Sequence, residues 1–344
     1  SRGLGDVYKR QGFCLWRLRA ARIARATCAR ACVAFESCGW VRHATRAGLG
    51  RTMPNPHLLI RPLLRREAVL SSRIEGTQAD LSALYSYEAR QLALPGLQPR
   101  SSDADVREVY NYVRALEYGL ERLKTLPVSL RLIRELHERL MEGVRGREAT
   151  PGEFRKSQNW IGPPGCTLNE ALFVPPPVQE MCQALDEFER YLHVGHDYPP
   201  LIRLAFIHYQ FEAIHPFLDG NGRIGRLLIT LLLVHWDILP LPLLYISAFF
   251  ESHREAYYDL LLKVSEKGAW KDWVLFFLQG VTEQARDAIE RAKRLQDLQT
   301  QWRQKVTKAR SSSLLAKLVD LLFEIPILTI PQTGRLLGVT YRSA

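Results

Sequence analysis

From about residue 58 onward, hydrophobic and polar positions follow a helical period over most of the chain. Between residues 60 and 84, apolar residues recur every three or four positions and charged residues occupy the other side, which predicts a helix. The same kind of pattern predicts further helices over residues 105–123, 129–143, 178–193, 201–214, 252–263, 270–278 and 282–308. An uninterrupted apolar run over residues 227–236 predicts a buried helix that begins near Arg223.

The helical pattern breaks between residues 143 and 177, where Gly and Pro are frequent. Two short runs of β-forming residues, 159–161 and 172–174, lie inside this segment. We expect them to pair as a small hairpin between loops. The predicted fold class is therefore mainly α, with one small β-hairpin.

The last part of the chain, residues 314–344, is similar to the front half of a winged helix-turn-helix. Two predicted helices, 314–323 and 330–337, are followed by a turn at 338–339. The chain stops where a recognition helix would begin, and two helices without that third element do not enter a DNA groove. DNA is therefore expected as a partner only if the full winged helix is present.

The net charge of +11 is concentrated at the amino-terminal end. Residues 1–50 hold ten Lys and Arg against two Asp and Glu, which gives +8 and leaves +3 for the other 294 residues. Such a small remainder is unlike a basic DNA-binding domain. The segment 1–46 is interpreted as non-native or disordered, and an Arg-rich transit peptide is the alternative.

Cysteine usage and hydropathy bear on the compartment. Four of the six cysteines lie before residue 50, and the remainder of the chain holds Cys166 and Cys182. Few thiols without a disulfide pattern are typical of a reducing compartment, so a cytoplasmic location is expected. No apolar stretch has the length of a membrane span, and no membrane partner is expected.

A twelve-residue stretch that starts at His215 groups the most informative side chains of the chain. It combines this titratable base with a hard-metal ligand, Asp219, a Gly-Asn-Gly turn, and the pair Arg223 and Arg226. A glycine-rich turn that leads into a helix presents main-chain N–H groups and the positive end of the helix dipole. Two guanidinium groups and a carboxylate for Mg²⁺ complete a site suited to polyphosphate.

This stretch resembles the signature of the Fic family, His-x-Phe-x-(Asp/Glu)-Gly-Asn-Gly-Arg-x-x-Arg, and matches it at every fixed position. The resemblance implies a Fic-type helical bundle with a hairpin flap, and transfer of AMP from ATP to a Tyr, Thr or Ser hydroxyl of a protein. It implies that His215 is the general base and that Asp219 holds Mg²⁺. The residues that it implies for phosphate binding are Gly220, Asn221, Gly222, Arg223 and Arg226.

A second element, Ser71-Ser72-Arg73-Ile74-Glu75-Gly76, matches the Fic-family pattern (Ser/Thr)-x-x-x-Glu-(Gly/Asn). The resemblance implies an inhibitory helix that packs against the active site. Its glutamate, Glu75, is expected to pair with Arg226 and so to remove the guanidinium that would hold the γ-phosphate.

Two further features fit the resemblance. Residues Asn169, Glu170, Ala171, Leu172 and Phe173 resemble the flap that aligns a target segment by strand-like pairing. Tyr257 is expected beside the adenine. Ser265 lies at the position where some relatives have an asparagine that reads the base. His208 and Glu212 are interpreted as structural residues.

The domains that we expect are residues 1–46, an inhibitory N-terminal region over 47–105, a catalytic domain over 106–280, a helical linker over 281–310, and a partial winged helix over 311–344. Protein adenylyltransferase activity is the leading hypothesis, with ATP and a hydroxyl-bearing protein as partners, and with self-modification and a homodimer as possibilities. Three alternatives stay open: removal of AMP in the same site, transfer of another nucleotide or phosphate group, and a DNA-binding regulator with a vestigial enzyme domain.

Overall fold

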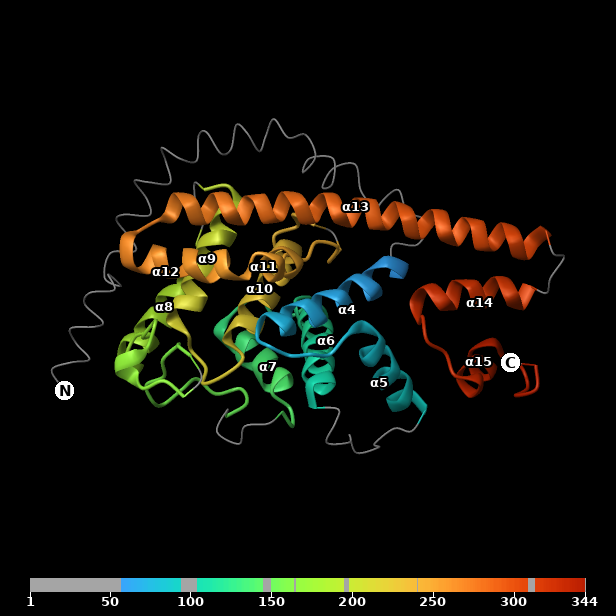
Figure 1. The fold of residues 1–344 in the computed structure, drawn as a ribbon, viewed down its shortest axis with the longest axis horizontal. Helices are drawn as coiled ribbons and strands as arrows, with labels where there is room; N and C mark the ends of the chain where they lie inside the picture. Colours follow the sequence, from blue (N-terminus) through green and yellow to red (C-terminus); the bar gives the residue numbers. More distant parts are fainter. Residues whose placement is uncertain are drawn as a thin grey trace.

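A computed structural model describes residues 57–93, 104–144, 150–163, 165–194, 198–239, 241–308 and 313–343. Within these ranges the chain is mostly helical and carries a single isolated β-bridge, which confirms the mainly α class (Figure 1). The segment that was interpreted as non-native or disordered, residues 1–46, lies outside the described residues.

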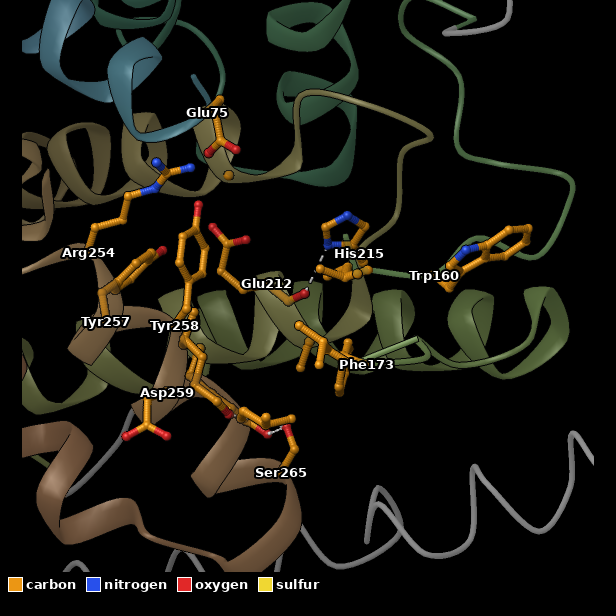
Figure 2. Close-up of a pocket in the computed structure, with 18 of the residues that line it drawn as sticks. Glu75, Trp160, Phe173, Glu212, His215, Arg254, Tyr257, Tyr258, Asp259 and Ser265 are labelled. Carbon is orange, nitrogen blue, oxygen red and sulfur yellow. Dashed lines mark hydrogen bonds between the residues drawn. The ribbon is translucent and has the colours of Figure 1, made fainter. Parts of the chain in front are cut away.

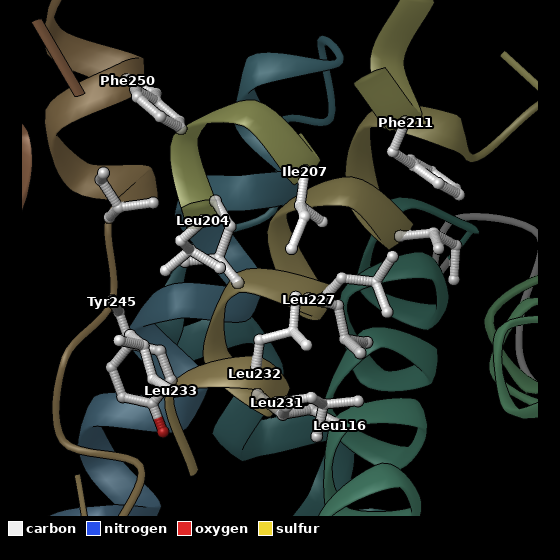
Figure 3. Packing of buried hydrophobic residues seen from close by; sticks show 14 of the residues in the cluster. Leu116, Leu204, Ile207, Phe211, Leu227, Leu231, Leu232, Leu233, Tyr245 and Phe250 are labelled. Carbon is white, nitrogen blue, oxygen red and sulfur yellow. The ribbon is translucent and has the colours of Figure 1, made fainter. Parts of the chain in front are cut away.

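Two almost wholly buried helices form the centre of the fold. Helix α9 (Pro200–Ile214) and helix α10 (Asn221–His235) pack against each other and carry apolar side chains on nearly all sides. A helix that is hydrophobic all round belongs in a core, which is why α10 was recognisable as an apolar run. Figure 3 shows Leu204 of α9 among the leucines of α10, with Leu231 of α10 beside Leu116 from a neighbouring helix.

Amphipathic helices surround this pair, as their hydrophobic periodicity predicted. Helix α6 (Ala104–Arg122) packs on α10 and on α7 (Leu130–Leu140), while α8 (Val178–His193) packs on α9. The start of α7 is fixed by Ser129, whose hydroxyl oxygen accepts a hydrogen bond from the N–H of Leu132 at 3.3 Å.

The helix predicted over residues 60–84 is wrong as a single element, because it is two helices with a break between them. Helix α4 (His57–Ile74) ends just before Glu75, and α5 (Leu81–Ala93) begins six residues later. Gly76 has φ +99°, which an L side chain rarely adopts and which stops the helix. The predicted inhibitory glutamate therefore lies at the tip of a helix rather than within one.

The hairpin predicted from residues 159–161 and 172–174 is reduced to one antiparallel bridge between Ile161 and Phe173. The N–H of Ile161 donates to the carbonyl of Phe173 at 2.9 Å, and the N–H of Phe173 donates back at 3.1 Å. A 3₁₀ turn, η4 (Leu168–Glu170), occupies the connection, so Asn169 and Glu170 of the predicted flap are in a turn and not in a strand.

The two helices predicted over 270–278 and 282–308 are one continuous helix, α13 (Trp270–Lys308), which runs along one side of the molecule (Figure 1). Gly280 does not interrupt it. A Cβ at this position would lie 2.5 Å from the ring of Phe249, which belongs to the short helix α11 (Ser247–Ser252) that the sequence did not predict. The glycine serves close packing of α11 on α13 rather than a turn.

Helix α12 (Arg254–Lys267) connects α11 to α13 and corresponds to the helix predicted over 252–263. The final two helices agree with the sequence prediction: α14 (Ser313–Glu324) and α15 (Ile330–Leu337) are followed by Gly338 at φ +69°. Helix α14 packs on both α13 and α4. None of the described helices combines the length and the apolar character that crossing a membrane requires.

Candidate functional site

The predicted motif forms a tight loop between α9 and α10. His215 ends α9 in the left-handed conformation, with φ 50° and ψ 60°, and Gly220 precedes α10 with φ 80°. The side chain of Asn221 closes the loop, because its Oδ1 accepts from the N–H of Phe217 and its Nδ2 donates to the carbonyl of Phe217, both at 2.8 Å. The amide predicted to contact phosphates is thus used within the loop.

The buried histidine His137, for which the sequence predicted no role, supports this loop from the side of the core. The N–H of Gly152 donates to Nδ1 of His137 at 2.9 Å, so the ring proton lies on Nε2 and is donated to the carbonyl of Asp219 at 3.0 Å. The imidazole is stacked on Phe217 with 3.7 Å between ring centroids. Burial lowers the pKa of His137 to about 4, so it stays neutral. A lone histidine on an amphipathic helix gives no sequence signal for this role.

The predicted pair between Glu75 and Arg226 is present. Nη2 of Arg226 lies 2.6 Å from Oε1 of Glu75, and the arginine side chain is 1% exposed. Ser71 holds the same guanidinium twice, since Nε donates to its hydroxyl oxygen at 2.8 Å and Nη2 donates to its carbonyl at 2.9 Å. Both ends of the matched Ser-to-Glu pattern therefore bind one arginine.

Arg223 is directed elsewhere. Its Nη1 lies 3.1 Å from Oε2 of Glu108, and its Nη2 lies 3.5 Å from Oδ1 of Asp219. The side chain is buried and is not part of the cavity wall, although it was predicted to clamp phosphates. Glu108, for which the sequence predicted no role, also accepts a hydrogen bond from Thr77 at 3.3 Å. Burial raises the pKa of this carboxyl above its usual value.

A cavity of about 630 Å³ opens beside the loop. Figure 2 shows Glu75 and Ser265 at opposite ends of it, with His215 on the side of Trp160. Gly222 and Arg226 complete the end that holds Glu75. A volume of this size is typical of small-molecule sites.

His215 presents a neutral imidazole to the cavity. Burial lowers its pKa to about 4, and its Nδ1 lies 3.3 Å from the main-chain oxygen of Glu212. The side chain of Glu212, interpreted from the sequence as structural, instead lines the cavity. Its Oε1 has no hydrogen-bond partner among the described residues, and burial raises its pKa to about 8.

The aromatic residues of α12 divide between core and cavity. Tyr257 touches the cavity but is 1% exposed, and its hydroxyl lies 2.9 Å from Nε2 of His208, which is buried as predicted for a structural histidine. Tyr258 is 41% exposed and offers the larger accessible ring surface. Ser265 lies farther along, with its hydroxyl 2.8 Å from that of Tyr209.

Asp219 is the metal ligand predicted from the sequence, and its side chain is 56% exposed. Across the described ranges no cluster of three or more His, Cys, Asp or Glu side chains could hold a metal ion by itself. A single accessible carboxylate fits Mg²⁺, which proteins commonly hold through one or two carboxylates together with substrate phosphates.

Comparisons with known proteins agree with the motif. Residues 127–233 match the model of the Fic/DOC family, and residues 44–121 match that of the Fic/DOC family N-terminal region. Over 206 residues the chain is 30% identical to Protein adenylyltransferase Fic of Drosophila persimilis and 29% identical to that of Drosophila melanogaster. These matches cover 59% of this chain but 36% and 37% of the fly proteins, so the chain spans little more than a third of their length.

Solved structures share the fold. A Fic family protein from Desulfovibrio desulfuricans superposes with a TM-score of 0.56 at 20% identity, covering 89% of this chain and 83% of that protein. Fic-1 from C. elegans gives a TM-score of 0.55 at 20% identity, covering 79% of this chain and 77% of that one.

Proposed function

The chain belongs to the Fic/DOC family, and from this we propose that it transfers AMP from ATP to a hydroxyl group of a protein, with Glu75 restraining the reaction. One observation carries the proposal: His215, Arg226 and Glu75 line the same cavity. A base, a phosphate-binding cation and a carboxylate that neutralises this cation thus share one site.

In the proposed reaction the target hydroxyl oxygen attacks the α-phosphorus of ATP, the bond to the bridging oxygen breaks, and pyrophosphate leaves. His215 accepts the hydroxyl proton on Nε2. Its Nδ1 lies 3.3 Å from the carbonyl of Glu212, which can only accept, so Nδ1 carries the ring proton and Nε2 is available. The lowered pKa keeps the imidazole neutral at pH 7, as a general base requires.

The phosphates are proposed to lie at the start of α10, where the main-chain N–H groups of Asn221 and Gly222 and the helix dipole favour an anion. The N–H of Gly220 donates to Oδ1 of Asp219 at 2.5 Å and so holds that carboxylate at the same turn. Gly222 and Arg226 line the cavity there. We assign the γ-phosphate contact to Arg226. Because Arg223 pairs with Glu108 and approaches Asp219, its proposed task is to orient this carboxylate.

Asp219 is proposed to hold Mg²⁺, which supplies charge neutralisation to the phosphates when it is bound. Its exposed carboxylate supports this assignment. The carbonyl of the same residue accepts from His137, so the loop that carries the carboxylate is fixed from the side of the core.

The far end of the cavity is proposed to receive the nucleobase. The ring of Tyr258 offers a stacking surface, and the hydroxyl pair of Ser265 and Tyr209 offers both a donor and an acceptor. Tyr257 also lines the cavity, and its ring is stacked on that of Phe250, with 4.4 Å between the ring centroids.

The target segment is proposed to dock along residues 169–173. Leu172 is 61% exposed beside the bridge between Ile161 and Phe173, and both of these residues reach the cavity wall. An extended segment that pairs with this main chain would bring a hydroxyl toward His215 with little side-chain readout.

Removal of AMP from a modified protein is a second candidate, favoured by one observation. The carboxylate of Glu75 is 35% exposed in the same cavity as His215, so it could accept a proton from a water molecule. The two candidate reactions differ in their response to loss of this carboxylate, since the rate of AMP transfer would rise and the rate of AMP removal would fall.

Intact-mass spectrometry of the protein incubated with ATP and Mg²⁺ and a panel of hydroxyl-bearing proteins tests the proposal. We expect an added AMP mass with Glu75→Gly and a faint or absent one with wild type. Loss of the adduct on adding His215→Ala would assign it to this site. No adduct with Glu75→Gly, together with loss of AMP from an added AMP-modified protein by wild type alone, would favour removal.

A further inference from the structure

Arg155 is a buried arginine beside the candidate site. It belongs neither to the motif that begins at His215 nor to the residues assigned to the proposed reaction. The side chain of Arg155 is 1% exposed, and among the described residues no carboxylate lies within ion-pair distance of it. Burying a guanidinium without a counter-ion is costly unless each N–H finds an acceptor. The contacts of this side chain therefore show what compensates for its burial.

Three main-chain carbonyls surround the guanidinium. Nε donates to the carbonyl of His215 at 3.0 Å, Nη1 donates to that of Ser157 at 3.1 Å, and Nη2 donates to that of Pro176. The main-chain N–H of Arg155 itself donates to the carbonyl of Pro216 at 2.9 Å. All of the partners are main-chain atoms, so the arginine fixes the course of the chain rather than another side chain.

The three carbonyls come from two parts of the site. Ser157 and Pro176 bound the flap segment, defined here as residues 157–176, which contains the bridge between Ile161 and Phe173. His215 is held at φ 50°, a conformation that is strained for a residue with a side chain. Arg155 thus connects both ends of the flap segment to the strained residue that carries the proposed base.

We propose that Arg155 is a positioning residue for the transfer reaction, which holds the main chain of His215 in its left-handed turn and sets its distance from the flap segment. This inference rests on the proposed function. Arg155 does not line the cavity, and it acts on the target hydroxyl through His215 and the flap segment. Its loss would misplace the imidazole relative to a docked hydroxyl while leaving the contacts around Arg226 in place.

A purely architectural role makes a different prediction. If Arg155 only stabilised the fold, its replacement would lower the melting temperature and weaken ATP binding together with transfer. A positioning role predicts that kcat falls while KM for ATP stays unchanged. A displacement of about 1 Å in a reacting group can cost 100-fold in rate, so kcat is expected to fall by about that factor.

The kinetic test compares Arg155→Met and Arg155→Lys in the Glu75→Gly background. Lys156→Met is the matched control, because it removes a positive charge at the neighbouring residue. The side chain of Lys156 is 82% exposed. We expect kcat to fall about 100-fold for Arg155→Met and less for Arg155→Lys, with KM for ATP within about twofold of the parent. Millimolar ethylguanidinium should restore part of the rate of Arg155→Ala, whose shortened side chain leaves room for it, and none for the control.

Hydrogen–deuterium exchange measured by mass spectrometry provides an arm that needs no transfer activity. In Arg155→Met we expect faster exchange at both ends of the flap segment and over residues 215–219, with the helices unchanged, and no change in Lys156→Met. If the Glu75→Gly parent transferred no AMP, the proposed function would fail and exchange alone would decide the role of Arg155.

Two results would overturn the inference. One is a folded Arg155→Met protein with parental kcat or with parental exchange over residues 215–219. The other is loss of the thermal transition and of ATP binding in both Arg155 variants, which would assign the arginine to fold stability.

Discussion

Arg226 and Glu75, 151 residues apart in the chain, form an ion pair with 2.6 Å between Nη2 and Oε1. The arginine is buried and cannot turn away, whereas the glutamate lies at the end of α4, next to a glycine at φ +99°. Burial opposes the charge on the guanidinium, but Glu75, together with Tyr257, Glu212 and Tyr258, outweighs this effect and leaves the pKa of Arg226 above its usual value. The carboxylate is thus the movable partner, and a phosphate must displace it.

Glu75→Gln is the first prediction. Removing the negative charge frees Arg226 for the γ-phosphate, and a charge-assisted hydrogen bond contributes about 1.5–3 kcal/mol. ATP affinity, measured by titration calorimetry, should rise roughly 10- to 100-fold. Glu251→Gln is the control, since Glu251 of α11 pairs at 3.8 Å with Arg73, which lies near the end of α4, but Glu251 is outside the cavity wall. Equal affinities for wild type and Glu75→Gln would show that the pair does not compete with ATP.

Two adjacent buried serines give the second prediction. The hydroxyl of Ser71 accepts from Nε of Arg226 at 2.8 Å, whereas that of Ser72 has no hydrogen-bond partner among the described residues. Ser71→Ala leaves a buried guanidinium N–H unpaired and should lower the free energy of unfolding by about 1–3 kcal/mol. Ser72→Ala should change it little. Urea denaturation of both variants measures the difference, and equal values would argue against this anchor.

The elements that sequence patterns predicted well are those whose signal is local. Helix α8 agrees with its predicted range because its apolar positions follow one period, and α10 agrees because a continuous apolar run belongs in a core. The Glu75–Arg226 pair followed from a family resemblance rather than from any physical pattern.

The features that the sequence did not predict have a different origin, since they depend on tertiary contacts. Gly76 and Gly280 are the same residue type in similar helical patterns, yet one stops a helix and the other lies within α13 against Phe249. Nothing local distinguishes them. The side chains of His137 and Arg155, which support the motif loop, donate to main-chain carbonyls of the loop, and such contacts leave no spacing in the sequence.

Gly280→Ala is the third prediction, which tests this account of α13. In an exposed helix the change would stabilise by up to about 1 kcal/mol. Here the added Cβ would lie 2.5 Å from the Phe249 ring, so α11 must shift. Overpacking of this kind costs about 1–3 kcal/mol, and thermal denaturation should show a lower melting temperature. Gln279→Ala, at the exposed neighbouring position, is the control. A higher melting temperature for Gly280→Ala would mean that α11 does not pack as described.

The last prediction concerns Glu212 and pH. Burial raises the pKa of this carboxyl from 4.5 to about 8, so the folded protein holds a proton that the unfolded chain releases above pH 4.5. A group whose pKa is raised on folding stabilises the fold below its unfolded value, and this contribution is lost as pH rises toward the folded value.

The wild-type free energy of unfolding should therefore fall between about pH 4.5 and pH 8, by roughly 2–3 kcal/mol at pH 7 relative to pH 4.5 from this group. Glu212→Gln keeps the shape and cannot ionise, so its stability should decline less over the same interval. Urea denaturation at several pH values gives the difference curve between the two proteins. A flat difference curve would mean that Glu212 has an ordinary pKa and that its cavity-facing carboxylate is charged at neutral pH. The measurement thus decides whether Arg226 faces one carboxylate or two when ATP arrives.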